Sequence, residues 1–391
     1  MARVTVPTPA AGRARFSEPV RHVAVSPDRY ARTVLEEIAP EATALRVQVA
    51  HRGAFVGGGV QAREEREAML DAHLAPGATR AVGAGDRALP EPPDPFRLCF
   101  ERDLDRVKHS RPWRRLAGKC QVFIAPGDDH LRTRMTHAVE VAQVATGIAR
   151  AARLCVPLVE AIALAHDCGH GPAGHPSEDA FSPYVPGGYD HAVWGADVTL
   201  SELNLCAPTL DGVRNHSWRR PAPSTPEGEV VAWADRIAYV CHDFEDAVSA
   251  GILTARDLPD DVAEVVGRRR SQQIGAFVLA VLDAIERTGR VGMTEPAASA
   301  LSQFRAFNFE RVYLRPAAVR QADRVIALLR GLVDFFVDVP ARTPGGGDLV
   351  PGSAESAAHA VRYVSGMTDR FALGLGVELL GWRAEDLPRG V

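Results

Sequence analysis

The segment between residues 134 and 178 is rich in histidine and acidic residues, whose side chains bind metals and transfer protons. It contains His137 and the adjacent pair His166-Asp167, and Asp235 follows in a strongly helical segment. Imidazole and carboxylate both suit divalent ions, and a mixed set of the two does not select among Mn, Fe, Co, Ni and Zn. These four residues are therefore the candidate ligands of one divalent ion.

Three helices must bring the candidate ligands together. The apolar pattern predicts helices at about 136–154, 157–167 and 227–250. Because His166 and Asp167 are neighbours, their side chains point about 100° apart, and both reach one ion only at a helix end or in a wide cavity. Four ligands from three helices leave room for water and a substrate oxygen, which is typical of a catalytic site. Taken one at a time, each residue also fits an ordinary core or surface position.

The chain beyond residue 96 is helical in its pattern throughout. Further helical segments are expected at 97–119, 260–288, 296–313, 316–336 and 354–380, with a short strand at 121–124 and a surface loop at 340–351. There is no strand–helix alternation of the kind that signals a doubly wound sheet. We therefore predict an all-α domain over residues 94–391.

The first 93 residues have a different composition. They contain, in order, a short helical pattern near 30–38, a strand-like piece at 45–56, a charged helix at 61–74 and a proline-rich linker at 76–95. We predict a small N-terminal extension over residues 1–93, in which mixed α/β structure is left open. No function is assigned to it.

Composition and charge are those of an ordinary globular protein of 391 residues. The formal net charge is -4, which gives no overall argument for nucleic acid binding. The N-terminus lacks the apolar core of a signal peptide, and no run is long enough to cross a membrane. Six cysteines are scattered without a C-x-x-C motif. We therefore expect reduced thiols, a cytoplasmic location and no membrane association.

The order of the candidate ligands matches a known signature. His137, then His166-Asp167, then Asp235 resembles the H…HD…D pattern of the HD-domain phosphohydrolases, and further blocks resemble one branch, the deoxynucleoside triphosphate triphosphohydrolases, which include bacterial dGTPases. The blocks are RDLDRVKHS (102–110), RRLAGKCQVF (114–123), RTRMTHAVEVAQVA (132–145), EAIALAHDCGHGPAGHPSE (160–178), NHS (215–217), VAWADRIAYVCHDFEDA (231–247), FERVY (309–313) and GMTDRFAL (366–373). The resemblance spans residues 96–380. It implies an all-α HD fold, one divalent ion (Mn, Mg, Fe, Co, Ni or Zn) and hydrolysis of dGTP or several dNTPs to deoxynucleoside and tripolyphosphate.

The same resemblance implies roles for other polar residues. Those expected at the phosphates are Arg134, His170, His191 and Arg236. His175 is implied to be the general acid for the leaving 5′ oxygen, with Glu178 as its orienting partner. On residue type alone, a solvated arginine and loop-capping histidines stay open as alternatives.

One face of the third helix is implied to bind the sugar. Asp235, Tyr239 and Asp243 follow at spacing i, i+4, i+8, so they share a helix face and should line one cavity. The resemblance implies that Tyr239 and Asp243 grip the deoxyribose, with Tyr239 excluding a ribose hydroxyl. Core packing of Tyr239 and a solvated position of Asp243 are the alternatives. His216 has a family counterpart but no role that its residue type suggests.

Two other functions remain open at this point. One is a different HD phosphohydrolase that acts on nucleoside monophosphates or alarmones, and the other is a nucleotide-sensing scaffold without turnover. Relatives assemble into tetramers or hexamers, so a homo-oligomer is expected by analogy. An allosteric nucleotide and a single-stranded nucleic acid effector are left open. Ala117, Cys120 and Ala173 depart from the family pattern, and the preferred base and native metal are not determined.

Overall fold

The computed structural model describes residues 33–37, 46–50, 57, 59–124 and 127–388. The chain divides into two compact units, Met1–Val60 and Gln61–Val391. The division does not lie at residue 93, because the proline-rich segment packs within the helical unit. There the Thr79 N–H and hydroxyl donate to Glu227 at 3.0 and 2.7 Å. A separate function for residues 1–93 stays a prediction.

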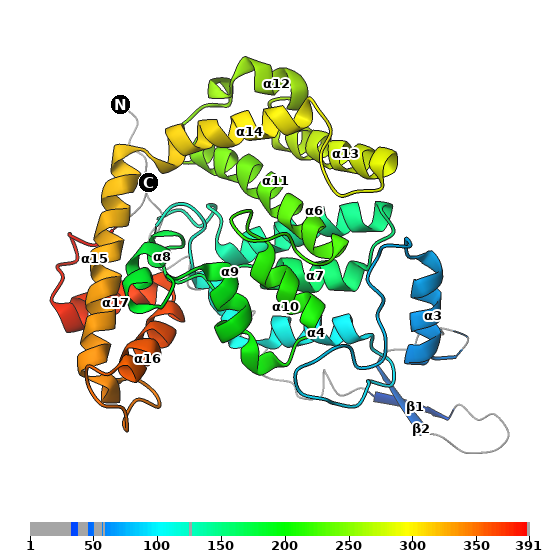
Figure 1. The fold of residues 1–391 in the computed structure, drawn as a ribbon, viewed down its shortest axis with the longest axis horizontal. Helices are drawn as coiled ribbons and strands as arrows, with labels where there is room; N and C mark the ends of the chain where they lie inside the picture. Colours follow the sequence, from blue (N-terminus) through cyan, green and yellow to red (C-terminus); the bar gives the residue numbers. More distant parts are fainter. Residues whose placement is uncertain (1–32, 38–45, 51–56, 58, 125–126, 389–391) are drawn as a thin grey trace. The chain divides into compact units, whose positions relative to one another are not determined.

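The first unit contains an antiparallel hairpin. Strand β1 (Thr33–Glu37) pairs with β2 (Arg46–Ala50), so that Thr33 faces Ala50 and Glu37 faces Arg46 (Figure 1). The strand expected within 45–56 is confirmed. The helical interpretation around 30–38 is wrong at Thr33–Glu37, because an apolar run this short fits a strand equally well and backbone pairing with β2 decides between them.

The second unit is built from helices, and among its described residues the extended backbone pairs only as two isolated bridges. Its helices are α3 (Arg63–His73), α4 (Cys99–His109), α5 (Arg111–Arg115), α6 (Arg134–Ala151), α7 (Val156–Ala165), α8 (Pro176–Phe181), α9 (His191–Trp194), α10 (Ala207–Asn215), α11 (Pro226–Ser249), α12 (Asp260–Val266), α13 (Arg270–Thr288), α14 (Ala297–Asn308), α15 (Pro316–Asp338), α16 (Ala354–Ser365) and α17 (Asp369–Leu380). The predicted all-α architecture is confirmed. None of the helices in the described part of the chain has the length and apolar character needed to cross a bilayer.

Several expected elements differ in detail. Residues 121–124 form bends beside a single bridge between Cys120 and Thr133, and not a strand. The helix expected over 260–288 breaks at Gly267, whose φ of +78° is left-handed. The one expected over 354–380 breaks before Thr368, whose hydroxyl accepts the Phe371 N–H and so begins α17.

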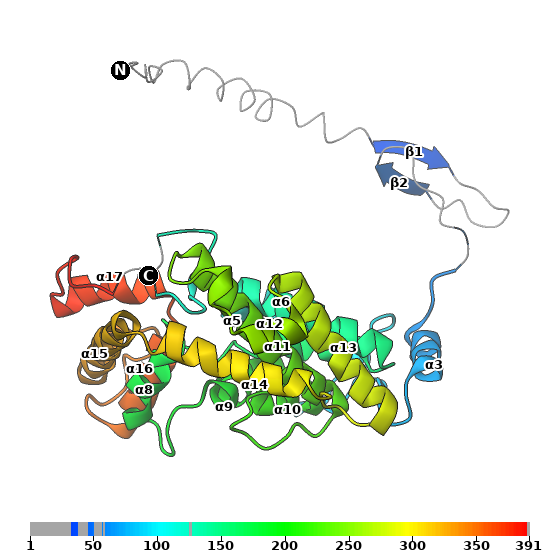
Figure 2. The same cartoon turned by 90° about the horizontal axis from the view of Figure 1, so that it is seen from above.

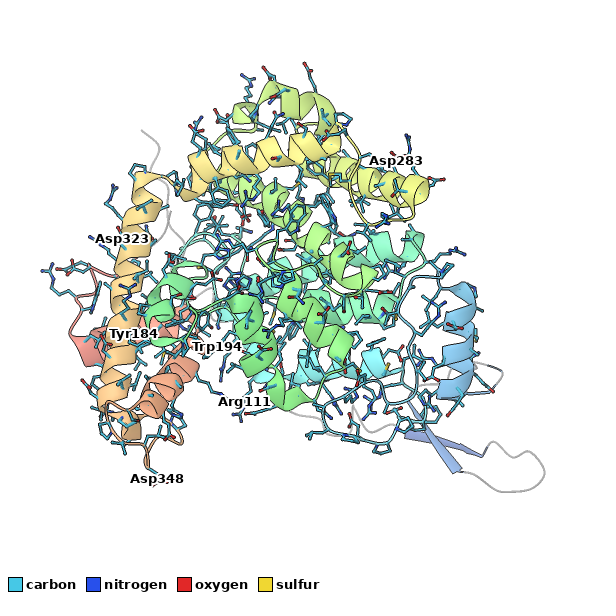
Figure 3. All side chains as sticks on the ribbon, in the orientation of Figure 1. Arg111, Tyr184, Trp194, Asp283, Asp323 and Asp348 are labelled. Atoms are coloured by element: carbon cyan, nitrogen blue, oxygen red, sulfur yellow. The ribbon has the colours of Figure 1, made fainter. Side chains whose placement is uncertain are left out.

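Two hydrophobic clusters hold the helical unit together, and Figures 1 and 2 show the helices that surround them. The larger lies among α4, α6, α7, α10 and α11, and α12–α14 pack beside α11. The smaller lies where α15 packs along α8, α16 and α17. At its edge, the Tyr184 hydroxyl donates to Asp334 of α15 at 2.6 Å (Figure 3). The histidine-rich segment 166–175 joins α7 to α8 and therefore lies at the junction of the two clusters.

Candidate metal centre and substrate cavity

Local sequence places the three helices that carry the candidate ligands. Thr133 caps α6, because its hydroxyl accepts the Thr136 N–H, and this puts His137 in the first turn. Helix α7 ends at Ala165, so the adjacent residues His166 and Asp167 lie at a helix end, where both side chains can reach one ion. Helix α11 begins behind Thr225, whose hydroxyl accepts the Gly228 N–H at 3.1 Å, and continues without a break.

The four predicted metal ligands form one cluster, in which His137, His166 and Asp167 are buried and Asp235 is partly exposed. His137 Nε2 lies 3.0 Å from Asp235 Oδ1, and His166 Nε2 lies 3.7 Å from the same oxygen. Asp167 Oδ1 lies 3.4 Å from His166 Nε2. Donor atoms at such separations suit ligands that share one ion through bonds of about 2.1 Å. The structure thus brings together residues from three helices that are up to 98 positions apart.

The hydrogen-bonding state of His166 fits a metal ligand. Its Nδ1–H donates to the Ala163 carbonyl at 2.7 Å, so Nε2 carries the lone pair. That Nε2 is buried and has no hydrogen-bond partner among the described residues. Metal-bound histidines usually donate their other nitrogen in this way, while an unsatisfied buried acceptor costs about 1–3 kcal/mol. The donor set therefore fits a divalent ion.

Arg134 contacts the candidate metal ligand Asp167 directly. Its Nη1 donates to Asp167 Oδ2 at 2.8 Å, and both side chains are almost fully buried. Burial favours a raised pKa for Asp167, but the charge of the Arg134 guanidinium outweighs it and holds this pKa well below the ordinary value. The guanidinium lies under Gly174, where a Cβ would come within 2.5 Å of Nη2. Gly174 also has a φ of +72°, so both geometry and crowding require glycine there.

A second group of histidines surrounds Glu178. The rings of His170 and His191 stack with centroids 3.7 Å apart. His191 Nδ1 donates to the Glu178 carboxylate, whereas His175 Nδ1 lies 3.7 Å from the same oxygen and its side chain is 69% exposed. The structure thus brings the expected pair His175–Glu178 together, but it gives Glu178 a closer partner in His191.

His216 lies beside this group and connects it with the metal ligands. Its Nδ1–H donates to the Val213 carbonyl at 2.7 Å, so its Nε2 accepts from His191 Nε2 at 3.2 Å. Burial lowers the pKa of His191, but the hydrogen bond and charge of Glu178 outweigh it and raise this pKa. The His216 ring lies 4.9 Å from that of His166. Sequence reasoning found His216 but could not place it, because its contacts come from other segments.

The face of α11 that carries Asp235 continues as expected through Tyr239 and Asp243. The Tyr239 hydroxyl accepts from Arg305 Nε at 2.9 Å. The Tyr313 hydroxyl donates to Asp243, and burial raises the pKa of Asp243 to about 7. Arg305 and Tyr313 were missed as site residues. Only Tyr313 had a signal in the sequence, because it lies in the FERVY block, and Arg305 had none.

One cavity of about 540 Å³ joins these groups, which is a typical volume for a small-molecule site. Every predicted site residue borders it except His166, which is fully buried behind the others. The Arg236 guanidinium lies 3.4 Å from the centroid of the Trp218 ring. Five arginines line the cavity: Arg134, Arg219, Arg236, Arg305 and Arg315. Of these, only Arg134 and Arg236 were predicted from the sequence. So many cations around one cavity suit a ligand with several negative charges.

Hydrogen bonds with Lys119 and with the start of α17, beside the smaller hydrophobic cluster, hold the loop between α7 and α8. Asp369, the first residue of α17, accepts the Cys120 N–H at 2.9 Å and the Ala173 N–H at 2.8 Å. The buried Lys119 ammonium donates to the His170 carbonyl and, at 2.9 Å, to the Ser365 carbonyl. Burial lowers the pKa of Lys119 to about 7. The start of α17 therefore fixes the loop that carries the histidines.

Comparison with known proteins gives consistent matches. The family described as HD domain matches residues 134–240, which include all four candidate ligands, and the phosphohydrolase-associated domain matches 291–376. A deoxyguanosinetriphosphate triphosphohydrolase-like protein of Caldanaerobacter subterraneus subsp. tengcongensis is 37% identical over 320 residues, which cover 80% of this chain and 94% of that protein. A deoxyguanosinetriphosphate triphosphohydrolase-like protein of Clostridium perfringens is 36% identical over 298 residues, which cover 72% of this chain and 86% of that protein. The solved structure of a hypothetical protein from Aquifex aeolicus is 16% identical to this chain, with a TM-score of 0.42, and the match covers 73% of this chain and 69% of that one. This similarity is too distant to support an argument.

Proposed function

The chain belongs to the HD-domain phosphohydrolases, in the branch of the deoxyguanosinetriphosphate triphosphohydrolase-like proteins, and on that basis we propose that it hydrolyses a deoxynucleoside triphosphate to deoxynucleoside and tripolyphosphate. The resemblance seen in the sequence is thereby confirmed at the level of the family. The observation that carries the proposal is the composition of the cavity. It is lined by three of the four candidate metal ligands (His137, Asp167 and Asp235), by five arginines including Arg134, and by Tyr239 with Asp243 along α11, and His166 lies directly behind the other ligands.

The reaction begins with the triphosphate held by the arginines. Arg134 is rigidly placed by Asp167 and Gly174, so it can hold a phosphate oxygen without reordering. A divalent ion bound by His137, His166, Asp167 and Asp235 would supply the positive charge that polarises a phosphate oxygen. Water oxygen attacks the α-phosphorus, and the bond from this phosphorus to the 5′ oxygen breaks. The products are therefore tripolyphosphate and a 5′ hydroxyl.

The leaving 5′ oxygen needs a proton, and the group around Glu178 can provide it. His175 is exposed to the cavity and lies near the Glu178 carboxylate, which orients it. His191 holds the same carboxylate from the other side. A positioned histidine acid of this kind contributes about 10²–10⁴-fold to a rate. We assign His175 as the proton donor and Glu178 as its positioning residue.

The sugar and base occupy the part of the cavity beyond the phosphates. Tyr239 is held by Arg305, and Asp243 by Tyr313, so both side chains are fixed along one wall. We propose that they contact the deoxyribose, with the Tyr239 ring closing over the 2′ carbon. His170, His191 and Arg236 stay proposed phosphate contacts. Whether dGTP alone or several dNTPs are substrates is part of the test below.

The test is a product assay with four dNTPs and four NTPs and several divalent metals, in which tripolyphosphate is resolved from smaller products. We expect tripolyphosphate from at least one dNTP. His166→Ala should lose activity and bound metal together, and it should lose the thermal stabilisation that added metal gives to the wild type. Pyrophosphate or orthophosphate as the first product would instead indicate another HD phosphohydrolase. Tight dNTP binding with no product would indicate a sensing scaffold.

A further inference from the structure

Arg236 is held in the candidate substrate cavity by an aromatic ring. Its guanidinium carbon lies 3.4 Å from the centroid of the Trp218 ring. Within the described part of the chain, its side chain makes neither a hydrogen bond nor an ion pair, and its buried Nε has no partner. Burial lowers the pKa of Arg236, and the positive charge of Arg305 acts in the same direction. The ring therefore places this guanidinium, while no carboxylate among these residues touches it.

Two other arginines of this cavity each donate to a protein group. Arg134 donates to the Asp167 carboxylate at 2.8 Å. Arg305 donates to the Tyr239 hydroxyl at 2.9 Å. Such bonds orient the side chain but occupy N–H donors, and a carboxylate also neutralises the charge.

The contact with the Trp218 ring leaves the donors of Arg236 unused. At 3.4 Å only a stacked arrangement fits, because an N–H directed at the ring would hold the guanidinium carbon farther away. In a stacked arrangement the N–H groups lie in the guanidinium plane and point past the edges of the ring. Arg236 is thus oriented with all its donors available, and these match the oxygens of a phosphate.

Trp218 is itself fixed in place. It lies in the segment between α10 and α11, and its Nε1–H donates to the Ala232 carbonyl at 3.1 Å. The Trp233 ring packs edge-on against it, with centroids 4.7 Å apart. Ala232 precedes Arg236 by one turn of α11, so the ring and the guanidinium are anchored to the same stretch of helix. Trp218 nevertheless lines the cavity and is 46% exposed, so core packing alone does not account for it.

We infer that Trp218 is a positioning residue, whose ring holds Arg236 so that its N–H groups contact the phosphate chain of the substrate. This inference rests on the proposed function, in which Arg236 is a phosphate contact. An arginine that is ordered before the substrate arrives loses less side-chain freedom on binding, so the phosphate chain is bound more tightly. Trp218 touches neither the metal ligands nor His175 in this arrangement, and it acts through Arg236.

The binding test uses the full chain with its divalent metal and inorganic tripolyphosphate as the probe, in isothermal titration. Trp218→Leu keeps apolar bulk against Trp233 but removes the aromatic face, so it should weaken binding about tenfold, as expected for a guanidinium on a ring. Trp218→Phe is the matched variant. Both variants lose the N–H to Ala232, but phenylalanine keeps a ring under Arg236 and should recover most of the affinity.

A double variant tests whether Trp218 acts through Arg236. Arg236→Ala should weaken tripolyphosphate binding at least as much as Trp218→Leu. The combination of Trp218→Leu with Arg236→Ala should then bind like Arg236→Ala alone, because the ring has no guanidinium left to hold. An additive loss in the double variant would overturn the inference, as would full affinity in Trp218→Leu or equal losses in Trp218→Leu and Trp218→Phe.

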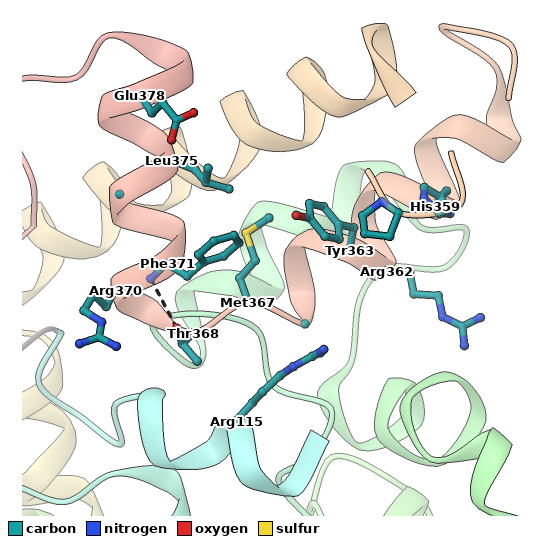
Figure 4. Close-up of a pocket in the computed structure, with 13 residues that line it drawn as sticks. Arg115, His359, Arg362, Tyr363, Met367, Thr368, Arg370, Phe371, Leu375 and Glu378 are labelled. Carbon is teal, nitrogen blue, oxygen red and sulfur yellow. Dashed lines mark hydrogen bonds between the residues drawn. The ribbon is translucent and has the colours of Figure 1, made fainter. Parts of the chain in front are cut away.

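Arg370→Ala is the control for the place of binding. This exposed arginine lines another cavity, of about 760 Å³ between α5, α16 and α17, which shares no lining residue with the candidate substrate cavity (Figure 4). Arg370→Ala should bind tripolyphosphate like the wild type. A loss in Arg370→Ala equal to that in Arg236→Ala, or no saturable binding to the wild type, would overturn the inference.

Steady-state kinetics with a hydrolysed dNTP supply the second measurement. Trp218→Leu should raise KM more than it lowers kcat, because the contact that it disturbs binds phosphate before the chemical step. A fall confined to kcat would overturn a role in phosphate binding. The titrations require no hydrolysis. A chain that shows the expected affinities but releases no tripolyphosphate from any dNTP would therefore refute the proposed function and still support the role of Trp218.

Discussion

The Nδ1–H of His191 donates to the carboxylate of Glu178, and this contact is closer than the one between Glu178 and His175. The proposed proton donor therefore depends on a carboxylate whose position is set by a second histidine. His191 is in turn hydrogen-bonded to His216, which packs against the ring of the candidate metal ligand His166. The group around Glu178 and the candidate metal centre thus form one continuous cluster of side chains.

The first prediction concerns this arrangement. Glu178→Gln and His191→Ala should each lower kcat by about 10²-fold, because both disturb the acid. KM should change only slightly in Glu178→Gln, whereas His191→Ala also removes a proposed phosphate contact and should raise KM. Steady-state kinetics measure the two constants. His73→Ala, an exposed histidine on α3, is the control and should leave both unchanged. Full kcat in His191→Ala would show that Glu178 positions His175 without help.

The second prediction concerns Tyr239. If its ring excludes the ribose hydroxyl, Tyr239→Ala should raise kcat/KM for NTPs relative to dNTPs by roughly 10–100-fold, the range in which a pocket rejects an added hydroxyl. Tyr239→Phe keeps the ring and loses only the contact with Arg305, so it should keep the discrimination. The measurement is the ratio of kcat/KM for matched pairs. The same loss of discrimination in both variants would contradict a role for the ring.

The third prediction separates two effects of Gly174. Alanine there must adopt a left-handed φ, which destabilises the fold by about 1–2 kcal/mol, and its Cβ must also displace Arg134. Gly187 has a φ of +82° but nothing within 4 Å of a Cβ, so Gly187→Ala carries only the first effect. Urea unfolding should show a similar loss of stability in both. Only Gly174→Ala should lose kcat/KM, by tenfold or more, and equal activity in the two variants would contradict the role of Arg134.

The fourth prediction uses the buried carboxyl of Asp243. Burial raises its pKa to about 7, whereas in the unfolded chain it is about 3.8. Between these values the folded state binds a proton that the unfolded state has lost, so stability falls as pH rises from about 4 to 7. The difference between the pKa values of 3.8 and about 7 corresponds to a loss of at most about 4 kcal/mol in the free energy of unfolding.

Urea unfolding at pH 4.5 and 7.5 measures this effect. Asp243→Asn keeps an acceptor for Tyr313 but cannot ionise, so its stability should fall less with rising pH than that of the wild type. Asp348→Asn, at an exposed site (Figure 3), should behave like the wild type. An identical pH dependence in Asp243→Asn and the wild type would show that Asp243 is ionised at low pH in the folded protein.

The sequence by itself determined most of the helices and singled out the candidate metal ligands. Periodicity and caps are local properties, so α6, α7 and α11 could be predicted with boundaries close to those observed. The spacing along α11 correctly put Tyr239 and Asp243 on the face of Asp235. The short segments at Thr33–Glu37 and 121–124 could not be predicted, because an apolar run of four or five residues carries too little periodicity to select a structure.

Only the tertiary structure decided which distant residues touch. The contacts of Glu178 with His191, of Tyr239 with Arg305 and of Asp243 with Tyr313 join segments 13, 66 and 70 residues apart. Such contacts depend on how helices pack, and the pattern within a helix reports which face is apolar but not what lies opposite it.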